Sequence, residues 1–124
     1  MIKAKLKKLL LAEDERTIAR ALKLKLELSG FEVITATNGE DALTILKEQK
    51  IDLLLLDIMM PKVDGFSVME EMKKMKNKTP IIVLSNLSQE DDIKRAQDLG
   101  AIDFFVKSNT PLSEILVKIN TFLK

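Results

Sequence analysis

The stretch that most constrains the fold is a short apolar run that stops on a carboxylate, IDLLLLD at residues 51–57. The run is too short to span a membrane and lacks period-2 alternation, a pattern typical of a β-strand covered on both faces in a parallel sheet. Pro61 then ends regular pairing, and Asp64-Gly65 forms a turn that can begin a helix. Asp57 would therefore lie at the carboxyl end of a buried strand, where open α/β sheets bind ligands. By itself, an Asp in this position more often only caps a loop.

Four more short apolar runs are predicted to be strands, and a segment with helical composition or spacing follows each of the five. The other predicted strands are residues 8–12, 31–36, 81–84 and 102–106. The predicted helices are residues 16–28, 39–49, 66–76, 89–99 and 111–122. Short strands that alternate with helices predict a doubly wound parallel sheet with helices on both faces, in one domain that spans residues 1–124.

The segment 16–28 is ambiguous, because its leucines alternate with charged residues as they would in a strand. We predict a helix, since the segment is rich in strong helix formers and Ser29-Gly30 supplies a C-terminal stop. Asn38, Ser88 and the pair Thr110-Pro111 are predicted to begin later helices. The predicted buried stripes are Ile18, Ala21, Leu22 and Leu26 in the first helix, Val68, Met69, Met72 and Met75 in the third, and Leu112, Ile115, Leu116, Ile119 and Phe122 in the last.

The composition excludes several classes of function. The charges of the 20 basic and 19 acidic side chains nearly cancel, so no net electrostatic field favours binding to nucleic acid or to an anionic membrane. The basic cluster at Lys3, Lys5, Lys7 and Lys8 is interpreted as a solvent-exposed segment before the first strand. The absence of Cys and His removes disulfides, thiolate or imidazole metal ligands and Ser-His-Asp catalysis. No signal peptide or transmembrane segment is predicted, and a cytoplasmic protein is expected.

Polar side chains follow four of the five predicted strands. In a parallel sheet these side chains gather along one edge, even though they are far apart in the sequence. Oxygen ligands without His or Cys favour a hard cation such as Mg²⁺, and a carboxylate beside a metal and an ammonium is a plausible nucleophile towards phosphorus. The residues concerned are Glu13, Asp14, Asp57, Ser85 and Lys107.

Four motifs together resemble the receiver domain of two-component response regulators. They are AEDE at 12–15, LLLLDIMMPKVDG at 53–65, PIIVLSN at 80–86 and LGAIDFFVK at 99–107, in the family's order and spacing. The resemblance implies a flavodoxin-like (βα)5 fold of strand order 2-1-3-4-5. It also implies phosphorylation by a partner histidine kinase or phosphotransfer protein, and no catalysis beyond the chain's own phosphorylation and dephosphorylation.

The same resemblance implies roles for individual residues. Asp57 is the implied phosphoacceptor, and Glu13 and Asp14 are the acidic pair at a site for Mg²⁺ or Mn²⁺. The backbone carbonyl of Met59 completes that metal site. The implied switch hydroxyl, lysine and switch aromatic are Ser85, Lys107 and Phe104.

Several positions depart from the usual pattern of the family. Ser108 stands where a proline in a cis peptide is common, and a non-proline cis bond would cost about 3 kcal/mol. Glu13 replaces the commoner Asp, and Phe104 lacks a hydroxyl. Met59 and Leu87 cannot orient an attacking water by charge or by a strong hydrogen bond, so we expect a slowly hydrolysed phosphate.

The sequence leaves alternatives to this interpretation. We expect a stand-alone receiver that acts through an unknown output partner, without direct nucleic-acid contact or membrane insertion, and homodimerisation on phosphorylation stays open. A rival is a receiver-like interaction module that acts without phosphorylation, which Ser108 favours. A haloacid-dehalogenase-type phosphatase is less consistent, because that class wants a second Asp where Met59 stands.

Overall fold

A single parallel sheet forms the centre of the molecule. The computed structural model describes residues 6–87 and 89–123, so the predicted cap at Ser88 and the lysines at positions 3 and 5 lie outside the described residues. All strand pairs are parallel and the spatial order is β2-β1-β3-β4-β5, which confirms the expected topology. The strands are β1 (Lys8–Ala12), β2 (Glu32–Ala36), β3 (Leu53–Leu56), β4 (Ile81–Ser85) and β5 (Asp103–Val106).

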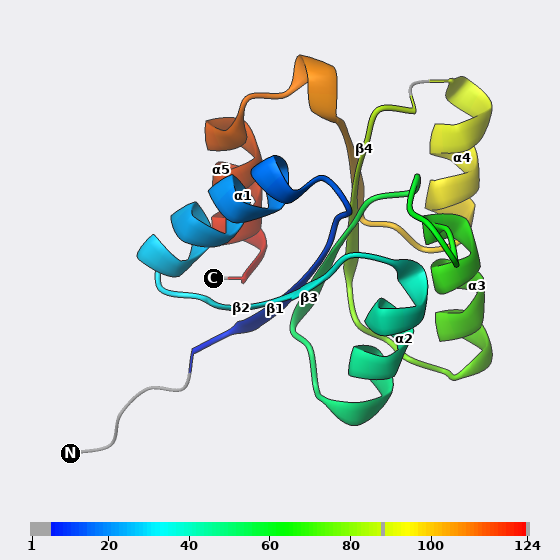
Figure 1. The fold of residues 1–124 in the computed structure, drawn as a ribbon. Helices are drawn as coiled ribbons and strands as arrows, with labels where there is room; N and C mark the ends of the chain where they lie inside the picture. The colour runs from blue at the N-terminus through cyan, green and yellow to red at the C-terminus, as the bar shows by residue number, and fades with distance from the viewer. Residues whose placement is uncertain (1–5, 88, 124) are drawn as a thin grey trace.

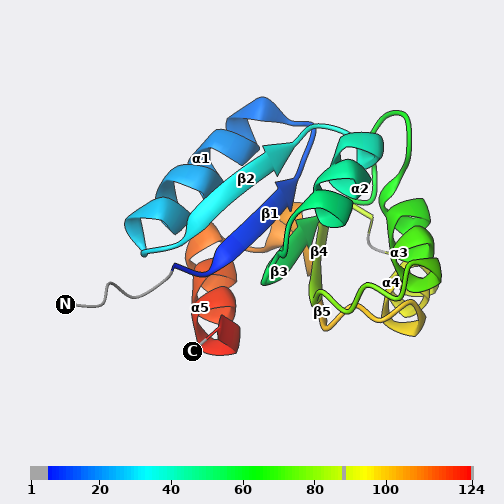
Figure 2. The ribbon, with the colours of Figure 1, turned by 90° about the horizontal axis from the view of Figure 1, so that it is seen from below.

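Helices cover both faces of this sheet, as the alternation of elements predicts. In Figures 1 and 2, α1 and α5 lie on one side of the sheet, and α2, α3 and α4 lie on the other. The boundaries are close to the predicted ones, and residues 16–28 are helical despite their alternating leucines. The helices are α1 (Arg16–Leu28), α2 (Gly39–Glu48), α3 (Gly65–Lys74), α4 (Glu90–Asp98) and α5 (Leu112–Leu123).

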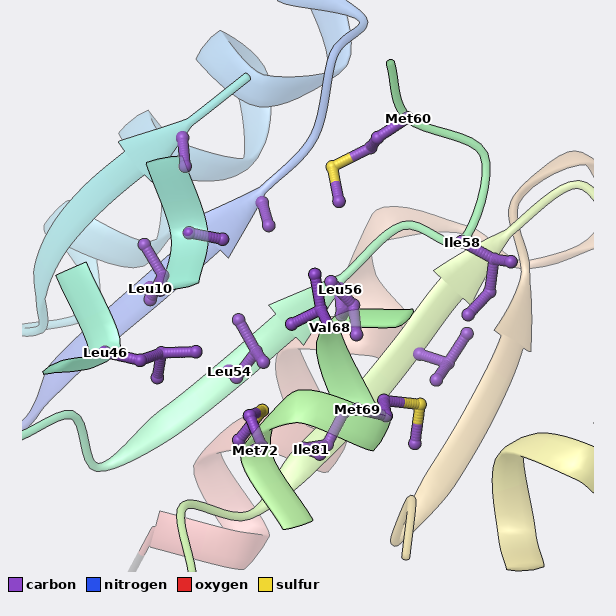
Figure 3. Close-up of a cluster of buried hydrophobic side chains, with 14 of the residues drawn as sticks. Leu10, Leu46, Leu54, Leu56, Ile58, Met60, Val68, Met69, Met72 and Ile81 are labelled. Carbon is purple, nitrogen blue, oxygen red and sulfur yellow. The ribbon is translucent and has the colours of Figure 1, made fainter. Parts of the chain in front are cut away.

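The core consists of two clusters, one on each face of the sheet. In β3, Leu54 and Leu56 point to the cluster under α2, α3 and α4, whereas Leu53 and Leu55 point to the cluster under α1 and α5. Figure 3 shows the first cluster, where Met69 and Met72 of α3 pack over β3. The central strand lacks apolar-polar alternation because both of its faces are buried.

Polar residues define where several elements begin. Asn38 Oδ1 accepts a hydrogen bond of 2.8 Å from the Asp41 N–H and caps α2, as predicted. Asp64 Oδ1 caps α3 in the same way, through the Ser67 N–H at 2.8 Å. Asp52, the one charged residue in the central apolar run, accepts a 2.7 Å hydrogen bond from the Lys8 N–H at the start of β1.

Some local predictions are wrong. Phe122 was expected on the buried face of the last helix, but it is 43% exposed, and the residues of α5 that are buried are Ile115 and Ile119. In α1 only Leu22 and Leu26 of the predicted stripe are fully buried. A 3₁₀ helix at Lys107–Asn109, which the sequence analysis did not predict, connects β5 to α5. Among the described residues, no helix has the length and hydropathy required to cross a membrane.

Candidate functional site

Asp57 lies directly after β3 at the carboxyl edge of the sheet, where its side chain is buried. The strand ladder extends to this residue, because the Asp57 N–H donates a hydrogen bond of 2.9 Å to the Ala12 carbonyl. Oδ1 accepts a hydrogen bond from the Met59 N–H at 3.1 Å, and Oδ2 lies 3.0 Å from Lys107 Nζ. The carboxylate therefore does cap the following loop, but its second oxygen faces the charged residue that directly follows β5.

Lys107 brings an ammonium group into the centre of this edge. Its side chain is only 7% exposed, and Nζ lies 2.6 Å from Glu13 Oε1, 3.0 Å from Asp57 Oδ2 and 3.3 Å from Glu15 Oε1. Burial acts to lower the pKa of Lys107, but hydrogen bonds and charge interactions with Glu13 and Asp57 outweigh it and raise the pKa above its ordinary value. Lys107 is therefore a fixed positive charge at any ordinary pH.

Glu15 is a contact that the sequence analysis missed. It is half exposed, just before α1, and its carboxylate reaches Lys107 although it follows β1, which lies three positions away from β5 in the sheet. The available signal was the third acidic residue of the motif AEDE, which was assigned no role.

Glu13 is almost completely buried, with only 1% of its surface exposed. Burial raises the pKa of Glu13 from 4.5 to about 7, against the lowering effects of Lys107 and of the Glu15 N–H, which donates to Oε2 at 3.0 Å. Oε1 lies 2.6 Å from Lys107 Nζ, so the ammonium is the charged partner of this buried oxygen. Glu13 is therefore part of the same buried charge cluster as Lys107 and Asp57.

The acidic residues are placed as a divalent metal site requires. Carboxylate oxygens of Glu13, Asp14 and Asp57 all lie within 4.8 Å of one another, and Asp14 is exposed at the open side of the cluster. An oxygen-only donor set of this size fits Mg²⁺, which binds through few protein carboxylates and retains several waters. The three predicted acidic residues thus meet in space and fit the cation that the sequence predicts.

The other predicted site residues are arranged around this cluster. Met59 follows Asp57 by two residues, and its side chain is 57% exposed. Ser85 is fully buried at the end of β4, where its Oγ accepts a hydrogen bond from the Leu87 N–H at 3.3 Å. Phe104 pairs with Val83 in the neighbouring strand and packs in part against the cluster under α2, α3 and α4.

The loop after Lys107 has an ordinary backbone. No cis peptide occurs among the described residues, so the bond between Lys107 and Ser108 is trans. The chain turns into the 3₁₀ helix at Lys107–Asn109 instead. Lys107 still reaches Asp57, so proline at position 108 is not required for that contact.

Comparison with known proteins identifies the family. Residues 9–120 match the sequence model of the response regulator receiver domain, and this range contains every residue of the cluster described above. The chain belongs to this family.

The receiver is similar to curated proteins that are about twice its length. It is 41% identical over 118 residues to the probable transcriptional regulator ycf27 of Cyanophora paradoxa, which covers 95% of this chain and 48% of the relative. It is 37% identical, over 95% of the chain and 49% of the relative, to the alkaline phosphatase synthesis transcriptional regulatory protein PhoP of Bacillus subtilis. The chain thus spans about half the length of the curated relatives it matches.

Solved structures of receivers superimpose on nearly the whole chain. The receiver domain of the Francisella response regulator 1452 matches with a TM-score of 0.87 and 30% identity, over 93% of this chain and 94% of that one. The response regulator TrrA of Thermotoga maritima, determined in complex with Mg²⁺-BeF, matches with a TM-score of 0.81 and 34% identity, over 94% and 98%. Proteins of this family act in signalling and are not enzymes in the ordinary sense.

Proposed function

We propose that this chain is a phosphorylation-dependent signalling switch that accepts a phosphoryl group on Asp57 from a histidine kinase or phosphotransfer protein. The observation that carries the proposal is the placement of the buried Asp57 carboxylate, 3.0 Å from Lys107 and within 4.8 Å of two further carboxylates. A carboxylate that only capped a loop would require neither a buried ammonium nor a neighbouring acidic pair.

Each residue of the cluster has a role in this proposal. Glu13, Asp14 and Asp57, with the backbone carbonyl of Met59, would hold Mg²⁺ or Mn²⁺. When bound, the cation neutralises charge on the phosphoryl oxygens. Lys107 neutralises charge on the same group, as an ammonium fixed by its buried contacts.

The transfer is a displacement at phosphorus. An oxygen of Asp57 attacks the phosphorus of a phosphohistidine, the new P–O bond forms as the P–N bond breaks, and the imidazole nitrogen keeps the electron pair. Hydrolysis reverses the state of the switch, because water attacks the phosphorus and releases inorganic phosphate and the Asp57 carboxylate.

The conformational response would begin at Ser85. Its Oγ accepts a hydrogen bond from the Leu87 N–H, and a phosphoryl oxygen on Asp57 would offer an acceptor for the Ser85 O–H. Such a switch works only as far as the phosphoryl group contacts the two states differently. Movement of Ser85 would shift the start of the segment towards α4 and let the partly buried Phe104 follow, which changes the face made by α4, β5 and α5 for an output partner or for a second copy.

The experiment is phosphorylation by a small acyl-phosphate donor in Mg²⁺, followed by intact mass measurement. We expect one added phosphoryl group in the wild type, none without Mg²⁺, and none in Asp57→Asn. Because Met59 and Leu87 offer no group that orients water, the adduct should decay slowly once the donor is removed. If the wild type forms no adduct, the result would favour a receiver-like module that acts without phosphorylation. If the adduct forms but decays quickly, only the expectation of slow hydrolysis would be contradicted, and the proposed switch would stand.

A further inference from the structure

The loop that follows Asp57 is anchored in the core on both sides of Met59. Ile58 is 3% exposed and Met60 is 8% exposed, and both belong to the cluster under α2, α3 and α4. Figure 3 shows the two side chains directed from the loop into that cluster. Met59, between them, is directed to solvent, so the backbone of this residue is fixed by its neighbours and not by its own side chain.

Backbone hydrogen bonds close the loop on itself. The Gly65 N–H donates to the Ile58 carbonyl at 2.8 Å, which joins the first residue of α3 to the residue after Asp57. The Val63 N–H donates to the Pro61 carbonyl at 2.9 Å, and Lys62 adopts the left-handed conformation, with φ of 68°. The segment 58–64 is therefore a tight loop with little freedom to shift in parts.

Gly39, the first residue of α2, lies directly against this loop. A Cβ atom at Gly39 would overlap the Val63 carbonyl oxygen and would lie 2.7 Å from its carbonyl carbon and 2.8 Å from its Cβ. The obstacle is backbone, which cannot turn away as a flexible side chain could. The backbone of Gly39 does not have a positive φ, so backbone conformation is not the reason for glycine here. Glycine is required because the Val63 backbone approaches too closely for a side chain.

Gly65 makes a similar contact at the other end of the loop. A Cβ there would lie 2.6 Å from the Asp57 carbonyl oxygen and 2.7 Å from Ile58 Cα. The loop is thus held between the first residues of α2 and α3, and α2 touches it although it contributes no side chain to the acidic cluster.

We propose that Gly39 is a positioning residue for the metal site. By allowing α2 to pack against Val63, it seats the loop so that the Met59 carbonyl is offered to the cation beside Asp57. This inference rests on the proposed function, because it assigns a geometric requirement to the same metal site. According to this inference, the packing of the first residue of α2 against the loop affects how tightly the site binds the cation.

The test is the Mg²⁺ affinity of the unphosphorylated chain, measured by isothermal titration calorimetry. Gly39→Ala must displace the loop or α2, and we expect Mg²⁺ binding to weaken by about tenfold or more, as for other residues that orient metal ligands. The matched control is Gly100→Ala, at φ of 105°, where an added Cβ meets nothing within 4 Å. This control strains the backbone and lowers stability, but it should leave Mg²⁺ affinity unchanged.

A second pair of variants covers the outcome in which Gly39→Ala does not fold. Met60 and Met72 belong to the same buried cluster, but only Met60 is on the loop. Each substitution by Ala should lower the midpoint of urea denaturation, because it removes a buried side chain. Only Met60→Ala should also weaken Mg²⁺ binding, because it removes an anchor next to Met59.

The outcomes separate this inference from the proposed function. One outcome is that the wild type takes up phosphate and binds Mg²⁺, while Gly39→Ala and Met60→Ala bind Mg²⁺ as tightly as their control variants do. This outcome would overturn the positioning role of Gly39 and leave the proposed phosphorylation switch intact. If the wild type binds no Mg²⁺, both proposals are overturned.

Discussion

Glu13 connects the chemistry of the site to the stability of the fold. Because burial raises its pKa from 4.5 to about 7, the folded chain binds more protons than the unfolded chain between these values. Its contribution to the free energy of unfolding is therefore fully present below about pH 4.5 and is lost as the pH rises through about 7. The sequence contains no His, so few other groups titrate in this window.

We expect the metal-free wild type to lose on the order of 2 kcal/mol of unfolding free energy between about pH 5 and about pH 8. Glu13→Gln should lose much less, because it has no proton to release. Urea denaturation followed by circular dichroism at several pH values measures both. Equal pH profiles for the two proteins would show that Glu13 is not the group responsible.

Lys107 is expected to stabilise the fold because its ammonium pairs with two buried carboxylates, those of Glu13 and Asp57. Lys107→Met leaves Glu13 and Asp57 without their ammonium, and removal of one partner from a buried ion pair typically costs about 3 kcal/mol. We expect a loss of this order in unfolding free energy, partly restored by Mg²⁺, which would neutralise the same carboxylates.

The matched control for Lys107 is Lys118, which pairs with Asp103 at 3.2 Å in a largely exposed position. Lys118→Met should cost less than about 1 kcal/mol and should not respond to Mg²⁺. Similar losses for the two lysine variants would contradict the structural importance of the buried pair.

At the scale of elements, α4 is attached to the rest of the molecule less firmly than α3 is. α4 fully buries only Ala96, whereas α3 buries five residues, from Gly65 to Met72. The two helices are joined by Arg95, whose guanidinium lies 4.2 Å above the Phe66 ring and 3.6 Å from Glu70. An element with few buried contacts is suited to move when the site at the sheet edge changes.

Amide hydrogen exchange should therefore be faster in α4 than in α3. Arg95→Ala should accelerate exchange in α4 further and lower global stability by no more than about 1 kcal/mol, because the side chains of Arg95 and Glu70 are about half exposed. Glu71→Ala is the control, since its ion pair with Lys74 stays within α3. Uniform exchange across both helices would contradict a loosely held α4.

At the scale of the whole molecule, the sequence predicts topology better than it predicts local contacts. The run of leucines before Asp57 identifies a strand buried on both faces, and the caps at Asn38 and Asp64 fix where helices begin, because these signals are local. Side chains that follow parallel strands must share an edge, so the meeting of Glu13, Asp57 and Lys107 was also predictable.

Other features depend on the three-dimensional arrangement. The contact of Glu15 with Lys107 joins residues 92 positions apart, and the exposure of Phe122 depends on how α5 packs against the rest of the molecule. Gly39 has no special backbone angle, and nothing in its sequence neighbourhood indicates that a distant carbonyl group lies against it. The loop after Lys107 forms a 3₁₀ turn that local propensity did not indicate.

The contact between Asp57 and Lys107 joins residues 50 positions apart, across the intervening strand β4. A ribosome therefore delivers the Asp57 carboxylate and its acidic neighbours Glu13 and Asp14 well before it delivers the Lys107 ammonium. Until β5 has been synthesised, Glu13 and Asp57 lack the buried ammonium that pairs with both of them in the folded chain. The cluster of Glu13, Asp57 and Lys107 is therefore complete only after β5 has been synthesised and has paired with β4.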